Sequence, residues 1–193
     1  MKTAFLAAIL TAAFTVPASA STWQIDPAHS EADFSVRHMA ISNVHGRFGN
    51  INGSLVLDDK DITKSSIKAT IDVSTLDSGV AQRDGHLKSP DFLDVAKYPQ
   101  MTFVSKSLSS NNGQLQLNGD LTMHGVTKNV TLALDGPSKE LVDSDGKTRR
   151  AFSATTRIHR QDFGLVWSGN LKSGEAVVAD DVNIELDIEL VKQ

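Results

Sequence analysis

The chain contains no cysteine, and this absence limits its chemistry before any fold is considered. Without thiols it has no disulfide, no thiolate nucleophile and no zinc site with sulfur ligands. Basic residues are also outnumbered, with 19 Lys and Arg against 23 Asp and Glu and a formal net charge of −4. A mildly acidic chain lacks the basic surface that phosphate backbones require, so we expect no nucleic-acid partner.

Long apolar runs are scarce, and the clearest one lies at the N-terminus. Lys2 precedes the apolar residues 4–16, and Ala18-Ser19-Ala20 follows as a small-x-small cleavage site. The run is too short to cross a bilayer, and no later stretch is apolar enough for a membrane helix. We therefore expect residues 1–20 to be a removed signal peptide for export, and residues 21–193 to form one domain without a membrane span.

Signatures of common enzyme classes are missing as well. The sequence has no Gly-x-Ser-x-Gly elbow, no His-Glu-x-x-His pair and no phosphate-binding glycine loop. Six histidines could hold a transition metal only if several converged, and they do not follow ligand spacing. These are His29, His38, His45, His86, His124 and His159. We expect no catalytic residue, no metal site and no required cofactor.

What the chain does have is alternation of apolar and polar residues with period two, which indicates strands with one buried face. The pattern is clearest near the C-terminus, at Val182, Ile184, Leu186, Ile188 and Leu190. Many such strands joined by short turns form either a sandwich or a closed barrel. Small inward residues such as Ala32, Ala69 and Ala154 favour a barrel with a cavity.

Two local features leave alternatives open or break the pattern. Asn52-Gly53 is a hairpin signal, but one long strand bulged at Gly49 or Gly53 is the favoured interpretation, because barrels bend strands at glycine. In residues 82–103 the alternation stops. There Ser89-Pro90 predicts the start of a helical turn that carries Phe92, Leu93 and Val95, and Tyr98-Pro99 predicts its end. We interpret this stretch as a helical plug over one barrel mouth, with its apolar side inward.

Four segments together resemble the YceI-like family of bacterial envelope proteins. They are IDPAHSEADFSVRHM from Ile25, RDGHLKSPDFLDVAKYPQMTF from Arg83, GDLTMHGVTKNVTL from Gly119 and RQDFG from Arg160. A departure is Asn129, where the family pattern often has proline. The resemblance implies an all-β fold, a lipocalin-like extended antiparallel barrel of about eight strands with one short helix across a mouth. It also implies a periplasmic protein whose pore binds a long isoprenoid lipid, such as a polyprenyl phosphate or an isoprenoid quinone, for storage, shielding or transport.

The inward positions of the expected strands and plug are the candidates for lining that pore. Strands of about nine residues, at roughly 3.3 Å each, would give a bore near 30 Å, enough for several isoprene units. The lipid-binding candidates are Phe34, Val36, Val44, Phe48, Ile67, Ile71, Leu87, Phe92, Phe103, Leu115, Leu117, Val130, Leu132, Ile184, Leu186 and Ile188.

A polar cluster could gather at the mouth and pair with a phosphate or a quinone oxygen. Its candidates are Arg37, His38, Arg83, Asp84 and His86. The favoured interpretation is structural: Asp84 pairs with an arginine or caps the helix and so holds the plug on the barrel. A periplasmic metal-dependent or hydrolytic enzyme that uses the mouth histidines and Asp84 is the alternative function. The sequence also leaves open whether the barrel forms a homodimer.

Overall fold

The fold is known from a computed structural model that describes residues 20–169, 171–172, 174 and 176–193. Apart from Ala20, the first residue of β1, the expected signal peptide lies outside the described residues. The strands are β1 (Ala20–Ile25), β2 (Glu31–His38), β3 (Ser42–Phe48), β4 (Ile51–Asp58), β5 (Ser66–Asp72), β6 (Gln100–Asn111), β7 (Gln114–Met123), β8 (Val126–Asp135), β9 (Leu141–Val142), β10 (Thr148–His159) and β11 (Val178–Lys192). One α-helix, α1 (Ala81–Lys88), and the short 3₁₀ helices η1 (Ile62–Lys64), η2 (Val73–Thr75) and η3 (Arg160–Phe163) complete the described elements.

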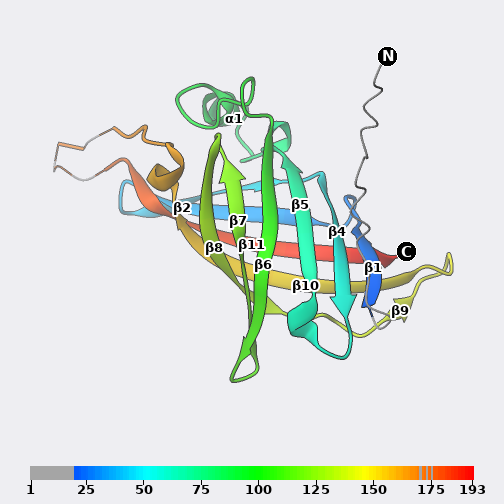
Figure 1. Cartoon of the computed structure of the whole chain (residues 1–193). Coiled ribbons are helices and arrows are strands. Elements are labelled where there is room, and N and C mark those ends of the chain that lie inside the picture. Colours follow the sequence, from blue (N-terminus) through cyan, green and yellow to red (C-terminus); the bar gives the residue numbers. More distant parts are fainter. Residues whose placement is uncertain (1–19, 170, 173, 175) are drawn as a thin grey trace, which may run out of the picture.

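Antiparallel pairing closes eight strands into a barrel, as expected (Figure 1). The ring runs β11, β1, β4, β5, β6, β7, β8 and β10, and β10 pairs with β11 along eleven positions to complete it. Closure gives every strand of this ring a partner on both sides, whereas β3 and β9, which lie outside the ring, pair on one side only. The long strand β11 pairs with β1 near its C-terminal end and with β2 over its first part.

The β3–β4 segment settles the choice between a hairpin and one interrupted strand. In a hairpin β3 and β4 would pair with each other. Instead β3 pairs with β2 and β4 pairs with β1, so β3 and β4 follow one another along the same side of the barrel. The break falls at residues 49–50, where Asn50 has a positive φ of 51°, and Gly53 lies inside β4 opposite Ala69. A Cβ at Gly53 would lie 2.9 Å from Cα of Ala69, so close strand approach explains this glycine. The hairpin alternative is wrong, because β3 and β4 do not pair with each other; the favoured interpretation holds for the interruption at Gly49, whereas the register through Gly53 is regular.

Tight turns connect the neighbouring strands on the other side of the barrel. The sequence predicts a tight turn at His124-Gly125, and the structure confirms it: both residues have positive φ and join β7 to β8, with Met123 opposite Val126. The turn-forming residues Ser109-Ser110-Asn111-Asn112-Gly113 predict a second turn, which is shorter in the structure than this run of five. β6 continues to Asn111, and the turn consists of Asn112 and Gly113. Polar residues 109–111 pair as a strand because β7 offers them a partner edge.

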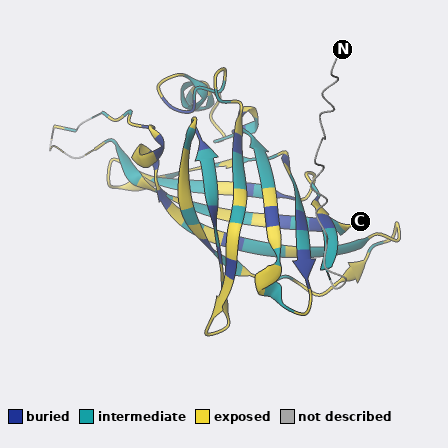
Figure 2. Ribbon diagram, in the orientation of Figure 1, coloured by how far each residue is buried: buried dark blue, intermediate teal, exposed yellow. Residues whose placement is uncertain are grey.

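The interior contains two groups of buried apolar residues (Figure 2). One surrounds Trp23 and Leu190, which are both fully buried where β1 meets β11. The other includes Val73, Met101 and Phe163 and lies toward the end that α1 and its following turns cover. All five alternating residues of the last strand face inward: Leu190 and Ile188 are buried, and the other three line the cavity described below.

The plug differs from its prediction in where the helix lies. α1 ends at Lys88, and Ser89 is already extended, with φ −74° and ψ 171°. Pro90 explains this, because a following proline disfavours the helical conformation of the residue before it. Ser89-Pro90 therefore ends the helix, and the prediction that it starts one is wrong. α1 has no buried residue; the buried apolar side chains Phe92 and Leu93 come from the turns after it.

Candidate functional site: an apolar cavity inside the barrel

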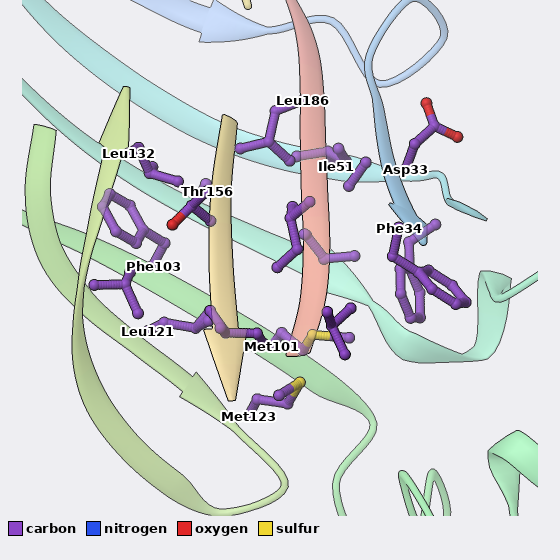
Figure 3. Close-up of a pocket in the computed structure, with 18 of the residues that line it drawn as sticks. Asp33, Phe34, Ile51, Met101, Phe103, Leu121, Met123, Leu132, Thr156 and Leu186 are labelled. Atoms are coloured by element: carbon purple, nitrogen blue, oxygen red, sulfur yellow. The ribbon is translucent and has the colours of Figure 1, made fainter. Parts of the chain in front are cut away.

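A cavity of about 210 Å³ lies inside the barrel (Figure 3). Its walls come from inward residues of most strands, and its covered end is formed by Leu87, Phe92 and Leu93. Four lining residues, Asp33, Thr102, Thr156 and Arg160, carry polar groups; the others are apolar. Alternation along the strands produces this wall, because every second side chain of a barrel strand points to the interior. Such a chamber favours hydrocarbon over water.

Most of the sequence-predicted lining residues meet in this cavity. Those present are Phe34, Val36, Phe48, Ile67, Ile71, Leu87, Phe92, Phe103, Leu117, Val130, Leu132, Ile184, Leu186 and Ile188. Leu115 lines a second, smaller cavity of about 50 Å³, which shares Ile67, Leu117 and Phe152 with the first. Val44 lines neither cavity. Its cross-strand partner Val36 on β2 lines the main cavity.

Several lining residues escaped the sequence analysis. Met101, Leu121 and Met123 continue the alternation of β6 and β7, so the period-two pattern could have found them. Leu76 and Leu165 come from irregular segments, where no periodicity points to the interior. Thr156 also faces the cavity, and its hydroxyl donates to the carbonyl of Thr131 at 2.8 Å. The Thr156 hydroxyl therefore has its hydrogen-bond acceptor within the barrel wall.

An aromatic cluster covers the mouth at the α1 end. The Trp167 ring lies 5.0 Å from the His86 ring and 5.1 Å from the Phe92 ring, measured between centroids. His86 also lies edge-on to Phe92 at 5.0 Å. These contacts join α1 and its following turn to the segment after η3. Trp167 sits in an irregular stretch, so nothing in its local pattern predicts this contact.

Arg83 and Asp84 make structural contacts, but not the ones that the sequence analysis favoured: among the described residues Asp84 has no ion pair with an arginine, and the N-cap of α1 is Val80, without a side-chain cap. Asp84 accepts hydrogen bonds from the backbone N–H of Ser78 at 2.8 Å and from its hydroxyl at 2.5 Å. These bonds hold the pKa of Asp84 below its usual value. Arg83 donates from Nε to the Ser78 hydroxyl at 2.8 Å and from Nη2 to the Ser78 carbonyl at 2.7 Å. Both side chains thus tie α1 to the loop before it.

The rest of the predicted polar cluster is dispersed. Arg37 donates to Oδ1 of Asn43 at 3.3 Å, on the outside of the β2–β3 pair. His86 pairs with Asp91 at 3.2 Å. In the described part of the chain no hydrogen bond or ion pair joins Arg37 or His38 to Arg83, Asp84 or His86. These contacts therefore do not link the five candidate side chains into one network in the described part of the chain.

The histidines do not assemble a metal site with Asp84. Among the described residues, one group of three potential ligands exists, formed by Asp26, His29 and Glu189. Arg149 already occupies it: Nη1 contacts Oδ2 of Asp26 at 2.6 Å and Oε1 of Glu189, and Nε contacts Oδ2 of Asp143 at 2.6 Å. A guanidinium in the centre of these carboxylates makes the group an ion-pair network that joins β10 and β11 to Asp26, just after β1, and to Asp143, just after β9. Across residues 20–193, the gaps aside, no helix has both the length and the apolar character needed to cross a membrane.

Comparison with known proteins agrees with this geometry. The YceI-like domain matches residues 23–190, nearly all of the described chain. The chain belongs to the YceI-like family. A UPF0312 protein of Vibrio parahaemolyticus is 36% identical over 200 residues, which cover 100% of both chains.

Solved structures of other proteins have a similar fold. Burkholderia cenocepacia BcnA superposes with a TM-score of 0.72 at 23% identity, covering 86% of this YceI-like chain and 98% of BcnA. A polyisoprenoid binding domain from Saccharophagus degradans superposes with a TM-score of 0.63 at 14% identity, covering 89% and 98% of the two chains. At sequence identities of 23% and 14%, these two comparisons show a similarity of fold alone.

Proposed function

We propose that this YceI-like protein binds a long-chain isoprenoid lipid in its barrel cavity, to store, shield or transport it. The polyprenyl phosphate and isoprenoid quinone types are the candidate ligands. The observation that carries the proposal is the nearly uniform apolar lining of the main cavity. The shared fold of the Saccharophagus degradans domain, which is named for polyisoprenoid binding, adds support.

The energetics of the tail favour such a chamber. Removing apolar surface from water is worth roughly 0.8 kcal/mol per methylene-sized group, so several isoprene units offer a large driving force. The walls need no specific polar contact to the tail, because burial is not directional. Ile67, Leu117 and Phe152 line both cavities, so movement of these side chains would give a longer tail further room in the second one.

We place this activity in the periplasm. The proposal rests on residues 1–20, whose positive start, apolar run and small-residue cleavage site have the features of an export signal. Mass spectrometry of the protein from its native envelope tests this part. We expect a mature N-terminus near Ser21, and a protein that keeps residues 1–20 would contradict export with cleavage.

Native mass spectrometry, followed by organic extraction of the purified protein, tests the ligand. We expect a co-purifying isoprenoid at one molecule per barrel. The matched variants are Ala69→Phe, which adds bulk to the cavity wall, and Thr70→Phe, which adds it at the next position along β5. Ala69→Phe should lose the ligand and Thr70→Phe should keep it. A folded protein that never carries or binds an isoprenoid would refute the proposal.

A further inference from the structure

The turn between β2 and β3 presents apolar side chains to solvent. It consists of Met39, Ala40 and Ile41, and it lies at the left of the barrel in Figure 1. Ile41 is 75% exposed and Met39 is 38% exposed. Packing within the barrel does not explain Ile41, because most of its apolar surface stays in water.

The backbone of this turn does not suit the residues that form it. Met39 and Ala40 have positive φ values of 50° and 59°. A residue with a Cβ adopts this conformation at a cost in free energy, which is why such turns favour Asn and Gly. Two other turns of the chain, Asn112-Gly113 and His124-Gly125, have the same positive φ values with glycine in the second position. The 39–41 turn therefore keeps apolar residues where Asn-Gly would be more stable.

The 39–41 turn adjoins the rim of the main cavity. The backbone N–H of Met39 donates to the carbonyl of Val177 at 2.8 Å. The next residue, Val178, lies opposite His38 and lines the cavity, as does Val36 on β2. The exposed apolar tip thus stands beside the chamber in which we place the lipid.

The charge around this turn has one sign. Residues 34–57 contain no Asp or Glu, although the whole chain has 23 of them. Arg37, two positions before Met39, is exposed, and its side chain contacts Asn43 at 3.3 Å. Within the described ranges no carboxylate forms an ion pair with Arg37, and Asp180 and Asp181 at the start of β11 pair with His159 instead. A cation without a counter-charge therefore flanks the apolar tip.

We propose that the 39–41 turn inserts into the surface of an anionic phospholipid bilayer, with Arg37 at the head groups. Interfacial membrane binding combines exposed apolar side chains with neighbouring cations, and this turn has both. The bilayer is the partner because the ligand proposed for the adjacent cavity is a lipid, so this inference rests on the proposed function. Docking through the turn brings the rim of the cavity to the membrane that supplies or receives that lipid.

Flotation of the purified, lipid-free protein with vesicles tests the docking. We expect it to float with mixed phosphatidylcholine–phosphatidylglycerol vesicles and to bind vesicles of phosphatidylcholine alone several-fold more weakly. Added salt should weaken binding to the mixed vesicles, because it screens the attraction between Arg37 and the anionic head groups. Absence of binding to the mixed vesicles would overturn the inference.

Single variants assign the binding to this turn. Ile41→Ser should lower affinity for the mixed vesicles by about tenfold, and Arg37→Gln should lower it by about fivefold. Leu141→Ser is the matched control, because Leu141 is 67% exposed on β9, lies opposite Arg149 far along β10 from η3, and follows the acidic Glu140. It should leave vesicle affinity unchanged. Equal losses in Ile41→Ser and Leu141→Ser would overturn the assignment to the 39–41 turn.

The double variant Met39→Asn with Ala40→Gly separates docking from folding. Asn-Gly fits the positive φ values, so we expect a higher Tm together with weaker vesicle binding. A turn whose apolar residues serve the fold alone predicts the opposite, a lower Tm with unchanged vesicle binding. That result would overturn the inference.

Two further measurements keep this inference apart from other outcomes. Displacement of a fluorescent isoprenoid by farnesol, measured without vesicles, reports the cavity alone, and the turn variants should keep the wild-type value. A protein that binds farnesol without binding vesicles would overturn the docking alone, and one that binds neither would overturn the proposed function as well. Sedimentation velocity tests for a second copy of the chain at the turn. A dimer that Ile41→Ser converts to a monomer would overturn the membrane as partner.

Discussion

The ring of Phe34 on β2 occupies space that a side chain at Gly46 on β3 would fill. The two residues are cross-strand partners, and a Cβ at Gly46 would lie 2.7 Å from Cε1 of Phe34 and closer still to Cζ. Phe34 lines the cavity, so the missing side chain at Gly46 sets how far this ring stands back from the chamber. The ring of Phe103 on β6 likewise occupies the space beside Gly119 on β7, although Phe103 lies opposite Leu121 and Gly119 lies opposite Ser105.

Gly46→Ala should therefore reduce lipid binding by pushing the Phe34 ring into the cavity. We expect a roughly threefold to tenfold loss of affinity and a destabilisation of about 1 to 3 kcal/mol, typical of an overpacked interior. Lipid titration and chemical denaturation measure the two effects. Gly49→Ala is the control, because a Cβ there meets nothing within 4 Å. Equal behaviour of the two variants would show that the Phe34 ring can move elsewhere.

Trp167→Ala should speed lipid release. Its indole contacts the rings of His86 and Phe92 at the mouth, so its removal opens the cover while the barrel pairing stays intact. Aromatic pairs of this kind contribute about 0.5–1.5 kcal/mol each, which predicts a dissociation rate several times faster. Stopped-flow transfer of a fluorescent isoprenoid to vesicles measures that rate. Val166→Ala removes the neighbouring side chain, which is 67% exposed, and should leave the rate unchanged. An unaltered rate in Trp167→Ala would place lipid exit elsewhere.

Arg83→Ala should lower thermal stability more than lipid affinity, because Arg83 anchors α1 to Ser78 and forms no part of the cavity wall. Loss of two hydrogen bonds is worth about 1 to 3 kcal/mol, a decrease of several degrees in Tm. Scanning calorimetry and lipid titration are measured on the same preparation. Arg37→Ala, which removes one exposed contact to Asn43, should change neither. Lost binding at an unchanged Tm in Arg83→Ala would instead indicate a role at the mouth.

Stability should fall between pH 4 and pH 2 through Asp26. Hydrogen bonds from Arg149 and then His29 lower the pKa of Asp26 from 3.8 to about 2. Because the folded pKa is the lower one, the stabilisation is present above pH 4 and is lost as the folded carboxylate becomes protonated. Asp26→Asn should cost about 1 to 2 kcal/mol at pH 7, a value discounted for solvent screening, and the difference should shrink toward pH 2.

Denaturant unfolding of wild type and Asp26→Asn across this range measures the effect. Asp145→Asn is the control, since the Asp145 side chain lies in an exposed turn outside the Arg149 network. The free energies of unfolding of wild type and Asp26→Asn could instead differ by a constant amount down to pH 2. That result would show that protonation of Asp26 does not cause the loss of stability in acid.

The sequence by itself determined the barrel wall. Period-two alternation is a local property that backbone geometry converts directly into an inside and an outside, so most inward residues of the strands could be named in advance. Turns such as His124-Gly125 can also be predicted from the sequence, because a positive φ depends on which residues occupy the turn, and glycine adopts it most readily. Ser89-Pro90 predicts a helix after it, whereas α1 lies before it. The pair marks a helix boundary but does not indicate on which side the helix lies.

Only the tertiary structure decided how the irregular segments cover the cavity. Arg160 and Trp167 lie where no periodicity exists, and their positions depend on carbonyls and rings brought from distant parts of the chain. Alternation is fixed by each strand alone, whereas contacts between loops are fixed by how the closed barrel places their ends.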